Sequence, residues 1–322
     1  MISTIMYPSV SVIVPIYNVA PYIERCARSL LEQSFQNVEY IFVNDCTPDN
    51  SIEILKDVIK EYPNRTSQIR IIHNKKNLGL AATRFVGLDT ANGKYILHCD
   101  SDDWVETNML QYMYDVAVKE NADIVCCEAI KELANGKLYY QYTYDEETIY
   151  NGLLDLQVSE IHVAIWNKLI KKELFTRNNI RNYDGINMGE DSALTIRLRY
   201  YSKKTIIIHR PLYHYNRTNS NSMVANIKKQ SIEERIELAK RIEAFFISLN
   251  KEKEFRTLIN FYKFDAKQFY IRKYHNIKKW KEVFPECHKD IFKFKHLTTI
   301  GRIKWWLCAY IPFFGLFIKN SK

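Results

Sequence analysis

Residues 10–33 read VSVIVPIYNVAPYIERCARSLLEQ, and this stretch decides the fold. Val10 to Ile16 is a short run rich in β-branched residues and interrupted by a proline near its end, which predicts a buried strand. From Pro21 to Gln33, apolar side chains recur at helical spacing: Ile23, Cys26, Ala27, Leu30 and Leu31. A strand followed at once by an amphipathic helix is the first unit of an α/β fold.

The same unit repeats along the first hundred residues. Apolar periodicity predicts strands over 39–43, 69–73 and 94–99, and helices over 51–62 and 80–90. This alternation predicts a Rossmann-like, mostly parallel sheet that is flanked by helices on both faces.

The second half of the chain alternates less regularly. We expect a strand over 123–129, a hairpin turning at Asn135-Gly136, a helix from Gly189 to Tyr201 and a strand over 204–209. Residues 214–223 (HYNRTNSNSM) predict a polar loop, and helical periodicity resumes near residue 227. We therefore predict one principal domain over 1–223 and a helical extension over 224–322.

Composition and charge restrict the class of protein. With 47% hydrophobic and 26% charged residues in 322, the chain reads as an ordinary globular protein. Its start lacks a basic segment and a cleavage site of a secretory signal, and its seven cysteines show no CxxC spacing, so we expect reduced thiols in the cytoplasm. The net charge of +9 indicates an anionic partner, which could be nucleic acid, a lipid surface or a phosphorylated substrate.

Polar residues follow three of the predicted strands directly. They are Tyr17-Asn18 after the first strand, Asn44 to Asp49 after the second, and Asp100 to Asp103 after the fourth, over 94–99. In open α/β sheets, ligands bind beyond the carboxyl ends of the strands, so these loops should converge on one crevice.

The acidic loop Asp100-Ser101-Asp102-Asp103 calls for a positive counter-charge. Mg²⁺ or Mn²⁺ suits one or two carboxylates together with phosphate oxygens, which predicts a site for a nucleotide diphosphate. The alternative is a solvated acidic turn that caps a helix beginning near Glu106.

These segments occur in an order typical of one family. VSVIVPIYN, VNDCTPDNS, NLGLAATRFVGLDTANGKYI and the acidic loop together resemble the family-2 glycosyltransferases with the GT-A fold. The resemblance covers roughly residues 9–220, with a nucleotide-sugar half at about 9–105 and an acceptor half at about 106–223. It implies an inverting, metal-dependent transfer from a nucleotide-diphosphate sugar, which we expect to be a UDP-sugar, onto a hydroxyl of a glycan or lipid-linked acceptor in cell-surface polysaccharide synthesis.

The resemblance also implies roles for individual residues on the donor side. Pro15 and Tyr17 would line the base pocket with Asn18, and Asp45 would hydrogen-bond the base. Asp49 and Arg84 would support the nucleotide, Asp100 and Ser101 would lie near the ribose and sugar, and Asp102 would ligate the metal. Asn44, Cys46 and Phe85 depart from the family pattern, which has Asp, Gly and Asn there.

On the acceptor side, the pair Glu190-Asp191 matches the family's catalytic acids. Asp191 is the expected base, with Glu190 as the other choice and a helix-capping acid as the structural alternative. Arg217 and Lys168 are candidate diphosphate contacts, Trp166 a candidate sugar platform, and His214 a candidate metal or phosphate contact. The first three each have a plain alternative as well: a solvated loop arginine, a surface lysine and a core tryptophan, respectively.

The C-terminal region concentrates basic residues and then aromatic ones. Residues 303–318 form an apolar run that is shorter than the ~20 residues of a spanning helix and is interrupted by Pro312 and Gly315. Lysines beside tryptophans favour the cytoplasmic leaflet of the cell membrane over nucleic acid as the partner. The alternative is a helix that packs on the protein or on a second subunit, so an oligomer is possible.

Three other functional classes compete with a glycosyltransferase. A nicotinamide dehydrogenase would need a glycine-rich turn after the first strand, and the chain contains no GxG. A nucleotidyltransferase is a more distant alternative, which also usually needs a glycine-rich phosphate loop. The third is a non-catalytic, membrane-associated scaffold that retains a nucleotide-sugar fold; the presence of Asp45, Asp102 and Asp191 argues against it.

Overall fold

The structure is a computed structural model that describes residues 7–136, 138–141, 160–220, 222, 227–294 and 297–311. The predicted alternation in its first half is confirmed. The strands are β1 (Val10–Ile16), β2 (Val38–Asn44), β3 (Ile69–His73), β4 (Tyr95–His98), β5 (Trp104–Val105), β6 (Ile124–Glu132), β7 (Leu138–Gln141), β8 (Lys168–Lys171) and β9 (Thr205–Asn216).

Helices connect these strands and extend the chain beyond them. They are α1 (Ile23–Leu31), α2 (Ser51–Lys60), α3 (Leu80–Thr90), α4 (Met109–Lys119), α6 (Glu160–Val163), α7 (Lys172–Arg177), α8 (Glu190–Tyr201), α9 (Lys229–Ser248), α10 (Arg256–Arg272), α11 (Ile277–Glu282) and α12 (Thr299–Tyr310). Two short 3₁₀ helices, η1 (Pro63–Gln68) and η3 (Pro285–Lys293), complete the described elements.

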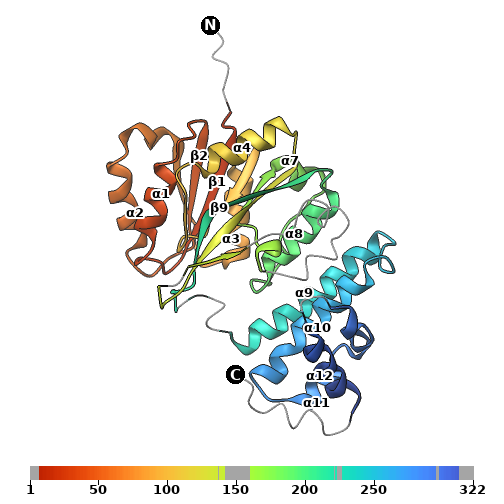
Figure 1. Cartoon of the computed structure of the whole chain (residues 1–322). Coiled ribbons are helices and arrows are strands. Elements are labelled where there is room, and N and C mark those ends of the chain that lie inside the picture. The colour runs from red at the N-terminus through yellow and green to blue at the C-terminus, as the bar shows by residue number, and fades with distance from the viewer. Residues whose placement is uncertain are drawn as a thin grey trace.

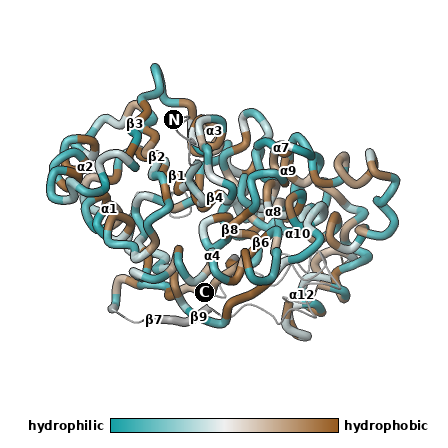
Figure 2. The backbone as a smooth tube through the Cα atoms, turned by 90° about the horizontal axis from the view of Figure 1, so that it is seen from above, coloured by the Kyte–Doolittle hydropathy of each residue, from teal (hydrophilic) through white to brown (hydrophobic). Residues whose placement is uncertain are grey.

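All described strands join one sheet in the order β3-β2-β1-β4-β8-β6-β9-β5, with β7 paired to β6. The pairings make β3, β2, β1, β4, β6 and β9 run in one direction, and β8, β5 and β7 in the other. The sheet is thus mostly parallel, as predicted. Figure 2 shows its strands crossing the middle of the molecule in this order, from β3 to β6.

Helices cover both faces of the sheet. The side chains of a strand alternate between the two faces, and in these strands both sets are apolar and need a cover. Val10, Val12 and Val14 of β1 pack with residues of α1, α2 and α4. Ile13 points the other way and packs with residues of α3, α7 and α8. Both faces are therefore dry, which explains the nearly continuous apolar composition of the parallel strands.

The proline in β1 does not break the sheet. Pairing with β4 ends at Ile13, where the N–H of Cys99 donates to the Ile13 carbonyl at 3.0 Å, whereas pairing with β2 continues to Ile16. The missing N–H of Pro15 falls on the side where β4 has already ended, so no ladder hydrogen bond is lost.

The last strand is longer than predicted, and this changes the site. The sequence predicts its end at His209, before Pro211, but β9 continues to Asn216. A register shift opposite Cys127 and Glu128 accommodates the proline, as β-bulges do. The second half of β9 then pairs with β5 directly after the acidic loop, so residues 214–216 belong to a strand and not to a polar loop.

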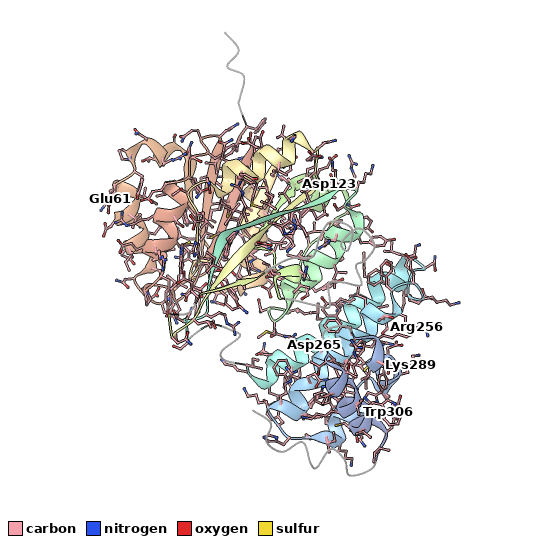
Figure 3. The ribbon with its side chains drawn as sticks, viewed as in Figure 1. Glu61, Asp123, Arg256, Asp265, Lys289 and Trp306 are labelled. Atoms are coloured by element: carbon pink, nitrogen blue, oxygen red, sulfur yellow. The ribbon has the colours of Figure 1, made fainter. Side chains whose placement is uncertain are left out.

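Helices α9 to α12 pack together on the side of the sheet at which β1 ends (Figure 1). Their core includes Phe246, Phe264, Trp280 and Phe294, and it is joined by Ile196 of α8. An ion pair of Arg235 with Asp265 connects α9 to α10; Asp265 is labelled in Figure 3. The predicted boundary near residue 224 lies outside the described residues.

Helix α12 has two apolar faces. Trp305 is only 9% exposed and stacks on Trp280, with 5.5 Å between ring centroids. Ile303 and Trp306, in contrast, are 47% and 38% exposed. The alternative prediction, a helix that packs on the protein, is therefore confirmed for one face of α12. Residues 312–318 of the predicted interfacial segment lie outside the described residues. Among the described helices, none is both long and apolar enough to cross a bilayer.

Gly87 of α3 tests the contact between this helix and the sheet. A β-carbon at residue 87 would lie 2.4 Å from Cγ2 of Ile13 on the strand below. Helix propensity alone predicts that Gly87→Ala stabilises the protein by ~1 kcal/mol. We expect the overlap of the added methyl group with Ile13 to outweigh this gain. The free energy of unfolding, measured by urea titration, should therefore fall by roughly 1–3 kcal/mol. A stabilised variant would contradict the close contact.

Candidate functional site

One buried arginine lies at the centre of the site. Arg84, one turn into α3, is 1% exposed and reaches the acid loop after β4 and the first turn of α8. Its guanidinium makes ion pairs with Asp100 at 2.6 Å, with Glu190 at 2.6 Å and with Asp191. The structure thus brings four of the predicted site residues together, from both predicted halves of the principal domain.

Three carboxylates around one guanidinium leave an excess of negative charge. Burial raises the pKa of Glu190 well above its ordinary value, and the Asp191 carboxylate raises it further against the effect of Arg84. Burial also raises the pKa of Asp191, while Arg84 lowers it in part. Asp191 also accepts a hydrogen bond from the Ile165 N–H at 3.3 Å, and its side chain is 21% exposed against 8% for Glu190.

The rest of the acid loop adds to this excess. Burial, followed by the neighbouring Asp100 carboxylate, raises the pKa of Asp102 to about 6. Its Oδ2 accepts a hydrogen bond from the Asn219 amide at 2.8 Å, which lowers the pKa in part. Ser101, between the two acids, is buried. A loop with this charge balance suits a bound cation.

Asp103 and Tyr213 shape the acid loop and were not predicted as site residues. The Tyr213 hydroxyl donates to Asp103 Oδ2 at 2.7 Å and accepts from the Asp100 N–H at 3.1 Å. Asp103 Oδ1 accepts from the Asn216 N–H at 2.8 Å. Alternation along β9 would have revealed Tyr213, but only if the strand had been extended past Pro211.

The loops after β1 and β2 are tied to each other. Asp49 Oδ2 accepts from the Ala20 N–H at 2.8 Å, and its Oδ1 accepts from the Thr47 and Ser51 hydroxyls, both at 2.6 Å. Burial raises the pKa of Asp49, but these hydrogen bonds outweigh it, so the pKa is lowered overall. Asn18, with φ of 55°, donates its N–H to Thr47 at 2.8 Å.

Asp45 organises the turn before α3. Its carboxylate accepts hydrogen bonds from the Asn74 amide and the Leu78 N–H, both at 2.8 Å, and from the Gly79 N–H at 2.9 Å. A carboxylate offers about four acceptor positions, so these three hydrogen bonds leave about one position of the buried Asp45 side chain unused. At the end of β1, Pro15 is buried, whereas Tyr17 is 49% exposed and presents an aromatic ring to solvent.

The structure contradicts the predicted phosphate contact of Lys168. Its side chain is buried, and its ammonium donates to the carbonyls of Ile161 at 3.0 Å and Ala164 at 2.6 Å and to the Asn167 amide oxygen at 2.8 Å. Burial lowers the pKa of Lys168 to about 8. The residue is neither a phosphate ligand nor a surface lysine; it holds the turn between α6 and β8.

The structure also contradicts the predicted metal or phosphate contact of His214. In β9 its side chain points to the opposite face from Tyr213, away from the acid loop. Its Nε2 lies 2.8 Å from Glu106 and its Nδ1 3.2 Å from Glu132, and the ring stacks on Trp104. The prediction failed because residues 214–216 were taken as a loop, in which alternation does not apply.

Two other predicted contacts have clear positions. Trp166 is 5% exposed and stacks on Tyr213, with ring centroids 4.4 Å apart, which supports the core interpretation. Arg217 is exposed directly after β9, and its guanidinium donates to the Tyr215 hydroxyl at 3.1 Å. It remains a candidate contact of the diphosphate.

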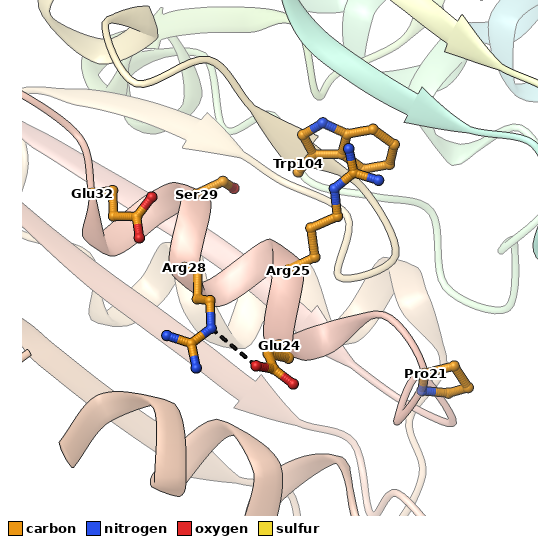
Figure 4. A pocket seen from close by; sticks show the side chains of 7 residues that line it. All are labelled: Pro21, Glu24, Arg25, Arg28, Ser29, Glu32 and Trp104. Atoms are coloured by element: carbon orange, nitrogen blue, oxygen red, sulfur yellow. Dashed lines mark hydrogen bonds and ion pairs between the residues drawn. The ribbon is translucent and has the colours of Figure 1, made fainter. Parts of the chain in front are cut away.

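A surface hollow of about 390 Å³ lies beside α1 and not over the acid loop. Figure 4 shows the Arg25 guanidinium over the Trp104 ring, 3.0 Å from its centroid, and Arg28 paired to Glu24. The remaining lining residues are Pro21, Ser29 and Glu32. None of the predicted catalytic or metal residues lines this hollow.

The described residues contain no cluster of three or more His, Cys, Asp or Glu side chains that could hold a metal by themselves. Asp102 nevertheless fits a hard cation, because its carboxylate lies in the same loop as Asp100 and the surrounding acids outnumber Arg84. One carboxylate completed by phosphate oxygens is a common way to bind Mg²⁺ in nucleotide enzymes.

Nucleotides bind beyond the carboxyl ends of the strands in many open α/β sheets, and this sheet carries its carboxylates there. Residues 11–178 match the model of glycosyl transferase family 2. The chain is 34% identical to the uncharacterized glycosyltransferase EpsJ of Bacillus subtilis over 238 residues, which are 72% of this chain and 67% of that protein. It therefore belongs to glycosyl transferase family 2 and is a glycosyltransferase.

Other similarities agree with this family. The cholesterol galactosyltransferase of Borreliella burgdorferi is 30% identical over 280 residues, 81% of this chain and 76% of that protein. The crystal structure of Staphylococcus aureus TarS 1–349 with UDP-GlcNAc aligns with a TM-score of 0.65 at 18% identity, over 94% of this chain and 87% of that one. The fold is therefore of the GT-A type, as predicted.

The raised pKa of Asp102 has a consequence for stability. A carboxyl whose pKa is higher in the folded than in the unfolded protein stabilises the fold below its ordinary pKa, and this contribution is lost as pH rises through about 6. In the absence of metal, Asp102→Asn should therefore raise the free energy of unfolding by about 1–2 kcal/mol at pH 7.5 and by about half as much at pH 5, which lies between the ordinary and the raised pKa.

Urea titration in EDTA at both pH values measures this difference. Asp184→Asn, which changes an exposed acid near α8, is the matched control and should leave stability unchanged at both pH values. A destabilised Asp102→Asn protein at pH 7.5 would show that the ionised carboxylate is favourable without a cation.

Proposed function

We propose that the protein is an inverting hexosyl- or N-acetylhexosaminyl-transferase that uses a UDP-sugar. The acceptor would be a hydroxyl of a glycan or a lipid-linked glycan in cell-surface polysaccharide synthesis. The observation that carries the proposal is the ion-paired set of Arg84 with Asp100, Glu190 and Asp191, which joins a donor-side acid to an acceptor-side acid pair. We also propose that 1–223 is the catalytic domain and 224–322 an extension.

The donor would bind across the ends of β1, β2 and β4. Tyr17, exposed beside buried Pro15, offers a surface for stacking of the base, and the free acceptor position of Asp45 offers a hydrogen bond. Asp49 and Asn18 keep the two loops together. Asp100 and Ser101 would face the ribose and the sugar, and exposed Arg217 would contact the diphosphate. TarS was crystallised with UDP-GlcNAc, which supports a uridine donor.

Asp102 would hold Mg²⁺ or Mn²⁺ together with oxygens of the diphosphate. Such a cation, when bound, stabilises the negative charge of the departing nucleoside diphosphate. A structural neighbour at a TM-score of 0.52, the mannosyltransferase PcManGT of Pyrobaculum calidifontis, was solved with GDP-Man and Mn²⁺. Its 16% identity supports the fold and leaves the metal a proposal for this chain.

Asp191 would act as the general base. It would take the proton of the acceptor hydroxyl as the oxygen attacks the anomeric carbon, and the bond to the diphosphate breaks on the opposite face of the sugar, which inverts the configuration. Asp191 is more exposed than Glu190, and Arg84 and the Ile165 N–H hold its two oxygens in place. The raised pKa of Asp191 makes its carboxylate a stronger base, because a general base works best when its pKa is near the operating pH.

A panel of nucleotide sugars with and without Mn²⁺ tests this proposal. We expect turnover of UDP-sugars that needs the metal, a loss of at least 10³-fold in Asp191→Asn with donor binding kept, and weaker donor binding in Asp102→Ala. Asp184→Asn is the exposed control. If no nucleotide sugar binds under any metal condition, the non-catalytic scaffold becomes the better explanation.

We further propose that the protein associates peripherally with the inner face of the cell membrane through α12. The exposed positions of this helix are mostly apolar, and they recur at the spacing of one helix face: Ile300, Ile303, Trp306 and Tyr310. A helix that turns such residues to water marks an interaction surface. The name of the Borreliella relative specifies a sterol acceptor, which fits an enzyme that works at a lipid surface.

Charge complementarity points to an anionic lipid surface. Residues 272–311 hold ten Lys and Arg against three Asp and Glu, so a net charge of +7 out of the chain's +9 lies here. Lys289 and Lys293 are exposed on η3 near Phe292, which is 51% exposed and faces Trp306 with 6.5 Å between ring centroids. Figure 3 labels Lys289 and Trp306 on these C-terminal helices. Aromatic rings beside lysines suit the headgroup region of an anionic leaflet.

Vesicle sedimentation tests the membrane surface. The parent should partition to vesicles of phosphatidylglycerol and phosphatidylcholine more strongly than to phosphatidylcholine alone, and 0.5 M salt should weaken this binding. The double change Ile303→Asp and Trp306→Asp should reduce partitioning more than tenfold. Val118→Asp, at a 50% exposed apolar site on α4, is the control. A parent protein that stays in the supernatant with anionic vesicles would contradict the proposal.

A further inference from the structure

Helix α9 of the C-terminal extension contacts the turn that leads into the acid pair. Oε2 of Glu234 accepts hydrogen bonds from the backbone N–H groups of Asn187, at 3.0 Å, and Met188, at 2.8 Å. A charged acceptor for two adjacent backbone donors gives stronger bonds than a neutral acceptor would. These two residues lie immediately before Gly189, from which Glu190 and Asp191 follow.

A second contact from the same face of α9 fixes the shape of the turn. Gly189 has φ of 89°, a conformation that glycine adopts without cost. Leu238, one helical turn beyond Glu234, packs so closely that a β-carbon on residue 189 would lie 2.8 Å from its Cδ2. Leu238 is itself 4% exposed. Helix α9 thus supplies both the hydrogen-bond acceptor and the wall of this turn.

The other side of the turn rests on the start of α3. Oδ1 of Asn187 accepts a hydrogen bond from the Ala81 N–H at 3.2 Å, and the same side chain occupies the space beside Gly79, 2.6 Å from where a β-carbon would lie. Arg84 follows on the next part of α3. The turn is therefore held between α9 and α3. Glu190 and Asp191, which follow the turn, form ion pairs with Arg84 of α3.

We propose that Glu234 is a positioning residue for the acid pair and that the helical extension is part of the catalytic unit. By holding residues 187 and 188, Glu234 sets where α8 begins, and so where the Asp191 carboxylate lies relative to Arg84 and the acceptor. Glu234 would act through this turn, by its hydrogen bonds to Asn187 and Met188, and not by contact with donor or acceptor. This inference rests on the proposed role of Asp191 as base.

Steady-state kinetics and amide exchange together test the inference on the full chain. In Glu234→Ala we expect kcat to fall roughly 10–100-fold with the dissociation constant of UDP within twofold of the parent, because the acids move and the donor loops do not. Glu234→Gln should recover most of kcat, since its amide oxygen can accept both hydrogen bonds. Hydrogen exchange should quicken at Asn187 and Met188 in the alanine variant only. Glu233→Ala, exposed on the neighbouring position of α9, is the control.

The outcomes separate this inference from the proposed function. Parent turnover and its loss in Asp191→Asn test the transferase and its base first. With both in place, a parental kcat in Glu234→Ala, despite faster exchange at residues 187 and 188, overturns the positioning role. If the alanine variant does not fold, Glu234→Asp replaces it; a retracted carboxylate should lower kcat at unchanged UDP affinity, and a parental kcat there overturns the inference equally.

Discussion

The site depends on one buried guanidinium that must satisfy three carboxylates. Arg84 reaches Asp100 on one side and the first turn of α8 on the other, so a single side chain fixes the distance between the acid loop and the acid pair. Removal of one partner from a buried ion pair leaves an uncompensated charge and costs several kcal/mol. The arginine therefore fixes the two halves of the site together.

The same arrangement keeps the site short of positive charge. Asp100, Asp102, Glu190 and Asp191 outnumber the arginine, and burial raises the pKa of the last three. A protein tolerates such an excess where a ligand supplies the missing charge, which is typical of functional sites. The excess of negative charge thus arises from the tertiary arrangement. A bound cation would balance it.

Helices α9 to α12 do more than extend the chain. One face of α9 supports the turn before the acids through Glu234 and Leu238, while α12 offers an apolar face to the surroundings. A single unit of packed helices thus lies between the reacting groups and the proposed lipid surface. The position of Trp305 in its core shows why hydropathy alone could not divide the C-terminal segment into packed and exposed residues.

The sequence by itself determined the alternating sheet, the family and the loops that carry the acids, because apolar periodicity and residues at strand ends are local signals. Only the tertiary structure decided which side chains meet. Arg84 and Asp191 are 107 positions apart, and Lys168 and His214 were assigned to the ligand although packing turns one into the turn before β8 and the other to the far side of β9. Direction and burial arise from contacts between distant segments, and a linear pattern does not contain them.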